Sequence, residues 1–359
     1  MTDDVRDETT GTVVLALGAN VGVAAAKIVG GLVSGSAALL SEGAHSVTDV
    51  LNEVFLLLSL HRSERPADRT HPFGYGMERF FWSLLAAVGI LVAGAGFAVY
   101  EGVGAVRGSD AETSTAQFVV VYVVLGVSLV FEAVSLTKAV RQVHGEAERA
   151  GRQLVTYVLR SPDPTVKTVA SEDSAAVVGI GIAVVGTALH QATGAEVWEG
   201  VASFVIAGLL AYVALALGRD TKELLIGEAA DPAVRLVALH VIAAHHEVER
   251  VAEILTMQLG PTSVLVAARI QFVEDVRARE IESVCTDIEQ EMLRRVPSLQ
   301  QVFLDPSTVT DDQVAAGRNL LAENVEDVRR LDGADAEILQ RLEDVRTTRT
   351  RAARRIAVR

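Results

Sequence analysis

Six long apolar stretches constrain the fold of this chain more than any other feature of its sequence. Each has about the 20 residues that a helix needs to cross the hydrocarbon core of a bilayer. Half of all residues are hydrophobic and only 5% are aromatic, a composition typical of helical membrane proteins. We therefore expect an all-α membrane region of six spanning helices, at residues 12–32, 37–60, 80–100, 118–136, 166–191 and 198–217.

Basic residues in the connecting loops predict the orientation of these helices. Lysine and arginine gather in the second and fourth loops, between residues 61–79 and 137–167, whereas the first and fifth loops contain neither and the third contains only Arg107. Loops rich in lysine and arginine stay on the cytoplasmic side. Both termini are therefore predicted to be cytoplasmic.

The composition changes after residue 219 and predicts a second domain of mixed structure. A helical pattern at residues 231–244 is followed by β-rich stretches at 248–259 and 263–273, a helix at 277–295 and a short strand at 299–304. This order, αββαβ, predicts a compact α+β module. We expect a segment at 1–11, the six-helix domain at 12–219, the α+β domain at 220–309 and a charged helical tail at 310–359.

A histidine and an acid lie one helical turn apart in the second apolar stretch, at His45 and Asp49. Spacing i, i+4 places them on one helix face, and Glu42 and Asn52 extend the same stripe. An ionisable group at the membrane centre costs roughly 2.5–3.5 kcal/mol, so such groups face a cavity, a partner or an ion. Imidazole with carboxylate is typical of sites for transition metals, zinc above all. The pair predicts a metal path through the membrane.

The fifth apolar stretch contains a second acidic pair, Glu172 and Asp173, which we expect to face His45 and Asp49. Adjacent helical residues differ by about 100° in direction, so only one of the two is predicted to point into a shared site. Asn20 in the first apolar stretch is a further candidate, whereas several other polar residues favour structural or interfacial roles. Lys27 and Glu101 are predicted to be interfacial and snorkelling, His190 interfacial, and Glu132 either a site residue or half of a structural pair with a lysine.

Several classes of function are excluded by composition. The net charge of −14 argues against a nucleic-acid partner. The single cysteine, Cys285, excludes an intramolecular disulfide and a thiolate metal cluster. The acidic first ten residues predict no cleaved signal peptide. We expect no enzymatic activity and no organic cofactor.

Four sequence stretches resemble the cation diffusion facilitator family of divalent-metal transporters, and within it the branch typified by the ninth vertebrate zinc transporter. They are SEGAHSVTDVLN at residues 41–52, HPFGYGMERFFW at 71–82, PTVKTVASEDSAA at 164–176 and ELLIGE at 223–228. The resemblance implies a homodimer of six-helix protomers with cytoplasmic ferredoxin-like domains. It also implies Zn²⁺ export in exchange for protons.

The family's second-helix metal ligands fall on His45 and Asp49. Its fifth-helix pair is usually His, three residues, then Asp, but valines stand four positions before and after Asp173. One of the usual four ligands is therefore missing. Glu172, Asn52 or water could complete the shell around the metal.

Some family members bind a further zinc ion in the loop between the second and third helices, through Asp, His and His. Asp68 and His71 match the first two ligands, but Tyr75 stands in place of the second histidine. The resemblance therefore implies only an incomplete secondary site in this loop.

The residues and the resemblance together predict a proton-coupled Zn²⁺ exporter that works by alternating access in a lipid bilayer, in a prokaryotic cell membrane. Protons and metal would compete for the same side chains. One nitrogen ligand among oxygens leaves a broader range open, with Mn²⁺, Co²⁺ or Ni²⁺. A channel fits less well, because the polar residues cluster at one depth. A membrane-anchored metal sensor or scaffold is a further alternative.

Overall fold

The computed structural model describes residues 3–107, 114–149, 153–161 and 163–308. The chain divides into two compact units. The first, here called the helical unit, comprises Met1–Gly145 and Asp163–Leu225, and the second, the α/β unit, comprises Glu146–Pro162 and Ile226–Arg359. The predicted charged tail at 310–359 lies outside the described residues.

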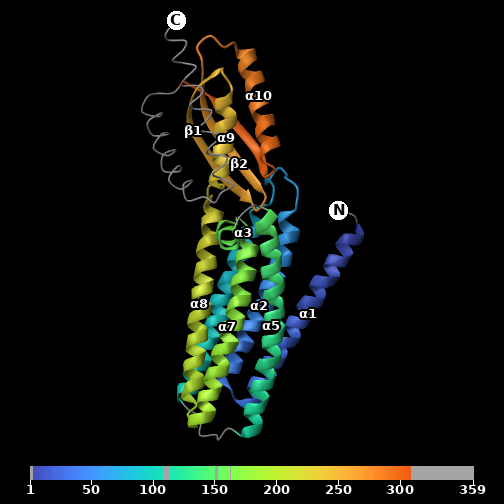
Figure 1. The fold of residues 1–359 in the computed structure, drawn as a ribbon, viewed down its shortest axis with the longest axis vertical. Helices are drawn as coiled ribbons and strands as arrows, with labels where there is room; N and C mark the ends of the chain where they lie inside the picture. Colours follow the sequence, from blue (N-terminus) through green and yellow to red (C-terminus); the bar gives the residue numbers. More distant parts are fainter. Residues whose placement is uncertain (1–2, 108–113, 150–152, 162, 309–359) are drawn as a thin grey trace. The chain divides into compact units, whose positions relative to one another are not determined.

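Helices cover all six predicted apolar stretches (Figure 1). They are α1 (Asp3–Ser34), α2 (Ala37–Ser63), the continuous series α3 (Glu78–Gly89), η1 (Ile90–Ala95) and α4 (Gly96–Arg107), then α5 (Thr115–Arg149), α7 (Pro164–Thr193) and α8 (Val197–Ile226). A short helix, α6, spans Leu154–Arg160. The first helix begins well before the predicted start at residue 12.

Four of these helices are long and apolar enough to cross a membrane, judged on the described residues. They are Glu78–Arg107, Thr115–Glu148, Pro164–Thr193 and Val197–Ile226. The apolar part of α1 that the structure describes, Asn20–Ser34, is shorter. Helix α2 is long enough, but its apolar face is interrupted by the polar stripe that includes His45 and Asp49. The structure thus supports a helical membrane region, and six spans stay a prediction.

A tight turn joins α1 to α2 and forces the two helices close together. Gly35 has a φ of +72°, a conformation that side chains other than glycine rarely adopt, and the Ser36 hydroxyl caps α2 by accepting from the Leu39 N–H at 3.2 Å. Further along, a side chain at Gly43 would lie 3.0 Å from Ile28 Cγ1 and 3.3 Å from its backbone nitrogen. The absence of a side chain therefore lets α2 approach the backbone of α1.

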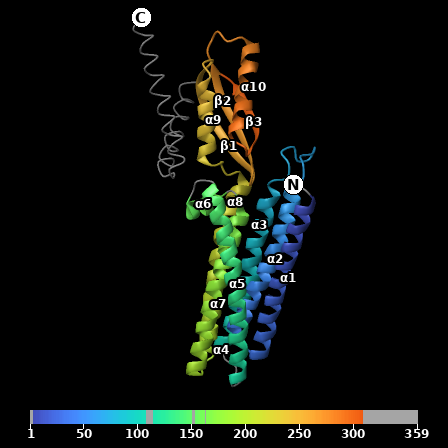
Figure 2. The ribbon, with the colours of Figure 1, turned by 45° about the vertical axis from the view of Figure 1, so that its right-hand side comes forward.

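The core of the helical unit joins helices that lie far apart in the sequence. Figure 2 shows α1 beside α2 and α5 beside α7. Buried aliphatic side chains from α2, η1, α5, α7 and α8 form one cluster, which includes Leu39, Ile90, Leu125, Ile180 and Leu210.

Many of the exposed side chains of the helical unit are large and apolar, among them Val92, Val130 and Tyr212. Several polar ones, including Lys27, Glu42 and His45, are buried. This is the arrangement expected of helices surrounded by lipid.

The helix from α3 to α4 contains a π-helical segment, η1, packed against neighbours on both sides. A side chain at Gly94 would lie 3.4 Å from the Thr48 hydroxyl of α2 and 3.3 Å from Leu210 of α8. Beyond η1, a side chain at Gly102 would lie 3.1 Å from the Gly200 carbonyl oxygen of α8. The glycine of η1 thus faces both α2 and α8, while the glycine of α4 faces α8.

The α/β unit contains the predicted helices and strands in the predicted order. They are α9 (Pro232–Ala244), β1 (Val248–Gly260), β2 (Ser263–Phe272), α10 (Ala278–Arg295) and β3 (Leu299–Pro306). The strands form a mixed sheet of order β1-β2-β3, in which β1 pairs antiparallel and β3 parallel with β2.

Alternate residues of β2 are buried, and they form a core with α9 and α10. Val264, Val266, Ala268 and Ile270 contribute from the strand, while Val241 and Ile242 of α9 and Val284, Ile288 and Met292 of α10 complete the cluster. The strand period of two therefore selects the sheet face that the helices cover.

We predict that Ile288→Ala destabilises the α/β unit by about 2–5 kcal/mol, because the fully buried side chain leaves a cavity. Hydrogen exchange of the β2 amides in the full chain measures the change. The matched control is Glu289→Ala, an exposed neighbour on the same helix. Equal protection of β2 in the two variants would contradict the assignment of Ile288 to this core.

Candidate metal site

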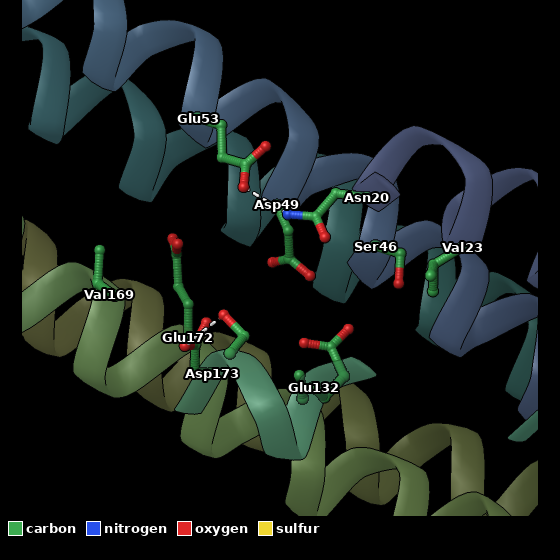
Figure 3. A pocket seen from close by; sticks show the side chains of 11 residues that line it. Asn20, Val23, Ser46, Asp49, Glu53, Glu132, Val169, Glu172 and Asp173 are labelled. Atoms are coloured by element: carbon green, nitrogen blue, oxygen red, sulfur yellow. Dashed lines mark hydrogen bonds between the residues drawn. The ribbon is translucent and has the colours of Figure 1, made fainter. Parts of the chain in front are cut away.

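An acidic cavity lies inside the helical unit, between α1, α2, α5 and α7 (Figure 3). Its volume is about 100 Å³, and its lining residues are Asn20, Val23, Ser46, Asp49, Glu53, Glu132, Ser135, Val169, Glu172, Asp173 and Ala176. Five of these carry a carboxyl group. No lysine or arginine is among the lining residues.

Helical spacing places the acidic groups around this cavity. Asp49 and Glu53 are one turn apart on α2 and point toward the opposite wall, where Glu132 of α5 and Glu172 and Asp173 of α7 lie (Figure 3). The site thus combines carboxylates from three helices.

Both residues of the α7 pair line the cavity, so the prediction that only one would reach it is wrong. Glu172 accepts a hydrogen bond from the Asn52 amide of α2, whereas Asp173 accepts one from the Ser135 hydroxyl of α5 at 3.0 Å. Because the cavity lies between α2 and α5, side chains that leave α7 about 100° apart reach opposite parts of it.

Hydrogen bonds between helices orient the acidic groups while other oxygen atoms remain without a partner. The Asn20 amide donates to Glu53, which joins α1 to α2. Among the described residues, the buried oxygens without a hydrogen-bond partner include Asp49 Oδ1, Asn52 Oδ1 and Glu53 Oε2. A buried polar atom without a partner is costly. These atoms therefore suit a cation or a proton as their partner.

His45 is buried beside the cavity and does not line it. Its side chain is 1% exposed, and its Nδ1 lies 3.4 Å from Asp49 Oδ1. Neither ring nitrogen has a hydrogen-bond partner. The predicted closeness of His45 and Asp49 is confirmed, and the imidazole has a lone pair to offer to a metal.

The predicted ligands share this region without forming a complete metal shell. Among the residues that the structure describes, no group of three or more His, Cys, Asp and Glu side chains could hold a metal ion as they stand. Asp49, Glu172 and Asp173 line one cavity, His45 lies behind Asp49, and Asn52 contacts Glu172. Binding one ion through all of them would require these side chains to come closer together than they stand.

Among the lining residues, sequence reasoning missed Glu53 and Ser135, named Asn20 only as a further candidate and left the role of Glu132 open. Glu53 carried a usable signal, since it continues the His45 and Asp49 spacing by one more turn. Ser135 carried none, because its role depends on its contact with Asp173 of another helix. Glu132 fits both interpretations, since it lines the cavity and lies 3.9 Å from the Lys27 ammonium.

Two predictions about interfacial residues are wrong. Lys27 is fully buried, and its ammonium lies 3.2 Å from Glu42 Oε2. His190 is also buried, with Nδ1 2.8 Å from Glu199 Oε1 and its ring edge-to-face with Phe118. In each case an acidic partner on the next helix of the chain offsets the cost of burying a polar group. Glu101 lies at a different pocket, among apolar side chains.

The loop residues Asp68 and His71 form a compact turn with Tyr75. Asp68 accepts hydrogen bonds from the Tyr75 hydroxyl at 2.7 Å and from the backbone N–H groups of Thr70 and His71. The Tyr75 hydroxyl, followed by the His71 N–H, holds the pKa of Asp68 below its usual value. His71 stacks on Tyr75, with its Nδ1 3.8 Å from Asp68. Both carboxylate oxygens of Asp68 thus accept hydrogen bonds within this turn.

Comparison with known proteins identifies relatives over this region. The family model for the cation efflux transmembrane domain matches residues 13–226. Metal tolerance protein C4 of Arabidopsis thaliana is 33% identical over 239 residues, covering 67% of this chain and 52% of the relative. The human protein named "Proton-coupled zinc antiporter SLC30A9, mitochondrial" is 30% identical over 247 residues, covering 68% and 43%.

A bacterial relative extends further along the chain. The manganese efflux system protein MneP of Bacillus subtilis is 23% identical over 290 residues, covering 81% of this chain and 93% of the relative. The chain spans about half the length of the plant and vertebrate relatives. Because relatives come from plants, vertebrates and bacteria, the expectation of a prokaryotic membrane is not supported.

The match to the family model covers more than half of the chain, including every residue that lines the acidic cavity. The similarity to the plant and vertebrate relatives agrees with this family match. The chain therefore belongs to the cation efflux, or cation diffusion facilitator, family of membrane metal transporters, which are not enzymes, and is related to the SLC30A9 zinc antiporters.

Proposed function

We propose that this protein is a proton-coupled antiporter that exports Zn²⁺ from the cytoplasm. The observation that carries the proposal is the cavity in which carboxyl groups of α2, α5 and α7 meet inside a helical unit with an apolar exterior. Relatives named as proton-coupled zinc antiporters support it. The transport site would consist of His45, Asp49 and Asp173, completed by Glu172 or Asn52.

The same side chains can bind metal and protons, and this supplies the coupling. Carboxylates and neutral imidazole bind a metal only when they are deprotonated, so metal binding releases protons and protonation releases the metal. Crowded carboxyl groups in a poorly solvated cavity repel one another when ionised. The cavity therefore favours binding of either a metal ion or protons, and binding of one displaces the other.

Alternating access would part α2 from α7, which the hydrogen bond from Asn52 to Glu172 joins. Transporters of this kind open a central site to one side at a time by rocking groups of helices against each other. We further propose six spanning helices, cytoplasmic termini and a homodimer. The basic second and fourth loops support this orientation.

Manganese is a second candidate substrate, favoured by the donors around the cavity. All its polar lining groups offer oxygen or amide donors, and His45 lies outside the lining. Oxygen-rich sites suit Mn²⁺, whereas imidazole suits Zn²⁺. The relative named as a manganese efflux protein agrees with this alternative.

We predict that Asp49→Asn lowers zinc-driven proton flux about tenfold or more, because it removes a charged ligand while keeping the side-chain size. The measurement is flux in proteoliposomes with an imposed pH gradient. Glu101→Gln is the matched control, since this acid lies outside the cavity. Undiminished flux in Asp49→Asn would refute the site, and zinc binding without flux in the native chain would indicate a sensor.

We predict that His45→Asp lowers the preference for Zn²⁺ over Mn²⁺ severalfold, because it exchanges the nitrogen ligand for oxygen. Competition between the two ions in the same flux assay measures the ratio. An unchanged ratio would show that His45 does not set the selectivity. The oxygen-lined cavity alone would then bind the metal, as the manganese candidate requires.

A further inference from the structure

Lys27 of α1 is a fully buried lysine at the edge of the acidic cavity. Its ammonium donates to the Ser46 hydroxyl at 2.8 Å and to Glu42 Oε2 at 3.2 Å, and it lies 3.9 Å from Glu132 Oε1. An ammonium has three donors and no acceptor. Three oxygen neighbours from α2 and α5 therefore match the charged form of this side chain.

Close helix packing places Lys27 and Glu42 together. The contact of Gly43 with Ile28 brings α2 against α1 at the adjacent positions. On the other side, Glu42 Oε1 occupies the space that a side chain at Gly179 of α7 would need. Glu42 is 0% exposed and is enclosed between two helices. It therefore stays with Lys27 as a buried ion pair.

Glu132 differs from Glu42 in its access to the cavity. Its side chain is 15% exposed and lines the cavity, as Ser46 does (Figure 3). One ammonium thus faces two carboxyl groups, one enclosed and one open to the transport site. If Glu132 turns to another cation, Lys27 keeps Glu42 and Ser46 as partners.

We propose that Lys27 is a built-in competitor that sets how tightly the cavity holds a divalent ion. The ammonium holds Glu132 in the absence of metal, and an incoming dication takes this carboxylate over because of its higher charge. This inference rests on the proposed transport function. A transport site must bind its ion firmly enough to load and weakly enough to release, and five carboxyl groups without a fixed cation would favour retention.

The test uses three full-length variants: Lys27→Met/Glu42→Gln, which removes the enclosed ion pair with little change in size, Glu132→Gln, and the triple variant. Calorimetry measures the Kd for Zn²⁺ and Mn²⁺ on the purified protein, and proteoliposome flux gives KM and Vmax. The double variant is expected to lower Kd and KM roughly three- to tenfold and to lower Vmax. In the Glu132→Gln background the same pair of changes should leave Kd unaltered.

A fourth variant, Glu42→Gln, gives an effect of opposite sign. It keeps the lysine but removes its enclosed partner, so Lys27 should hold Glu132 more tightly and Kd should rise severalfold. This variant also serves if the double variant does not fold. A purely structural role for Lys27 would lower Vmax in both cases without tightening binding in either. Glu101→Gln controls for the loss of an acid from the helices.

The two proposals fail in different ways. Absence of flux in the native chain would refute transport, whereas the Kd values would still test the competitor. An unchanged or higher Kd in the double variant, or an equal shift with and without Glu132, would refute the role of Lys27 alone.

Discussion

The helical unit depends on hydrogen bonds and ion pairs between helices, which join polar groups that lipid cannot solvate. Lys27 pairs with Glu42, Asn20 with Glu53, Asn52 with Glu172, and Ser135 with Asp173. The first two pairs join α1 to α2, the third joins α2 to α7 and the fourth joins α5 to α7. Polar groups without partners would be costly in this environment. The contacts that hold α1, α2, α5 and α7 together therefore also shape the acidic cavity.

Local sequence patterns were sufficient for the elements and for half of the site. The strands and helices of the α/β unit follow from periodicity within short windows, and His45, Asp49, Glu172 and Asp173 are conspicuous because apolar residues surround them. These patterns did not predict that β3 pairs with β2. The two strands are separated in the sequence by α10, so their pairing depends on contacts between distant residues.

The missing half of the site depends on contacts between helices. Lys27 reads as a snorkelling residue on its own helix, and only the approach of Glu42 and Glu132, 15 and 105 positions away, explains its burial. The hydroxyl of Ser135 gives no signal in the sequence, and the partner of the Asn20 amide becomes known only when α1 and α2 are packed together. Tertiary packing rather than local propensity decides which polar residues meet.

The π-helical segment η1 changes the direction in which the side chains of α4 point relative to those of α3. A π-turn contains an extra residue, so every side chain after Ala95 is rotated by about 100° relative to an uninterrupted α-helix. Loss of one residue here would leave the helix long enough for a bilayer. It would also let an uninterrupted α-helix keep Gly102 against Gly200, whereas closing the π-turn without such a loss would turn Gly102 away and bring a bulkier side chain into that narrow contact. The number of residues in this helix and the π-turn that absorbs one of them therefore set its angular register together.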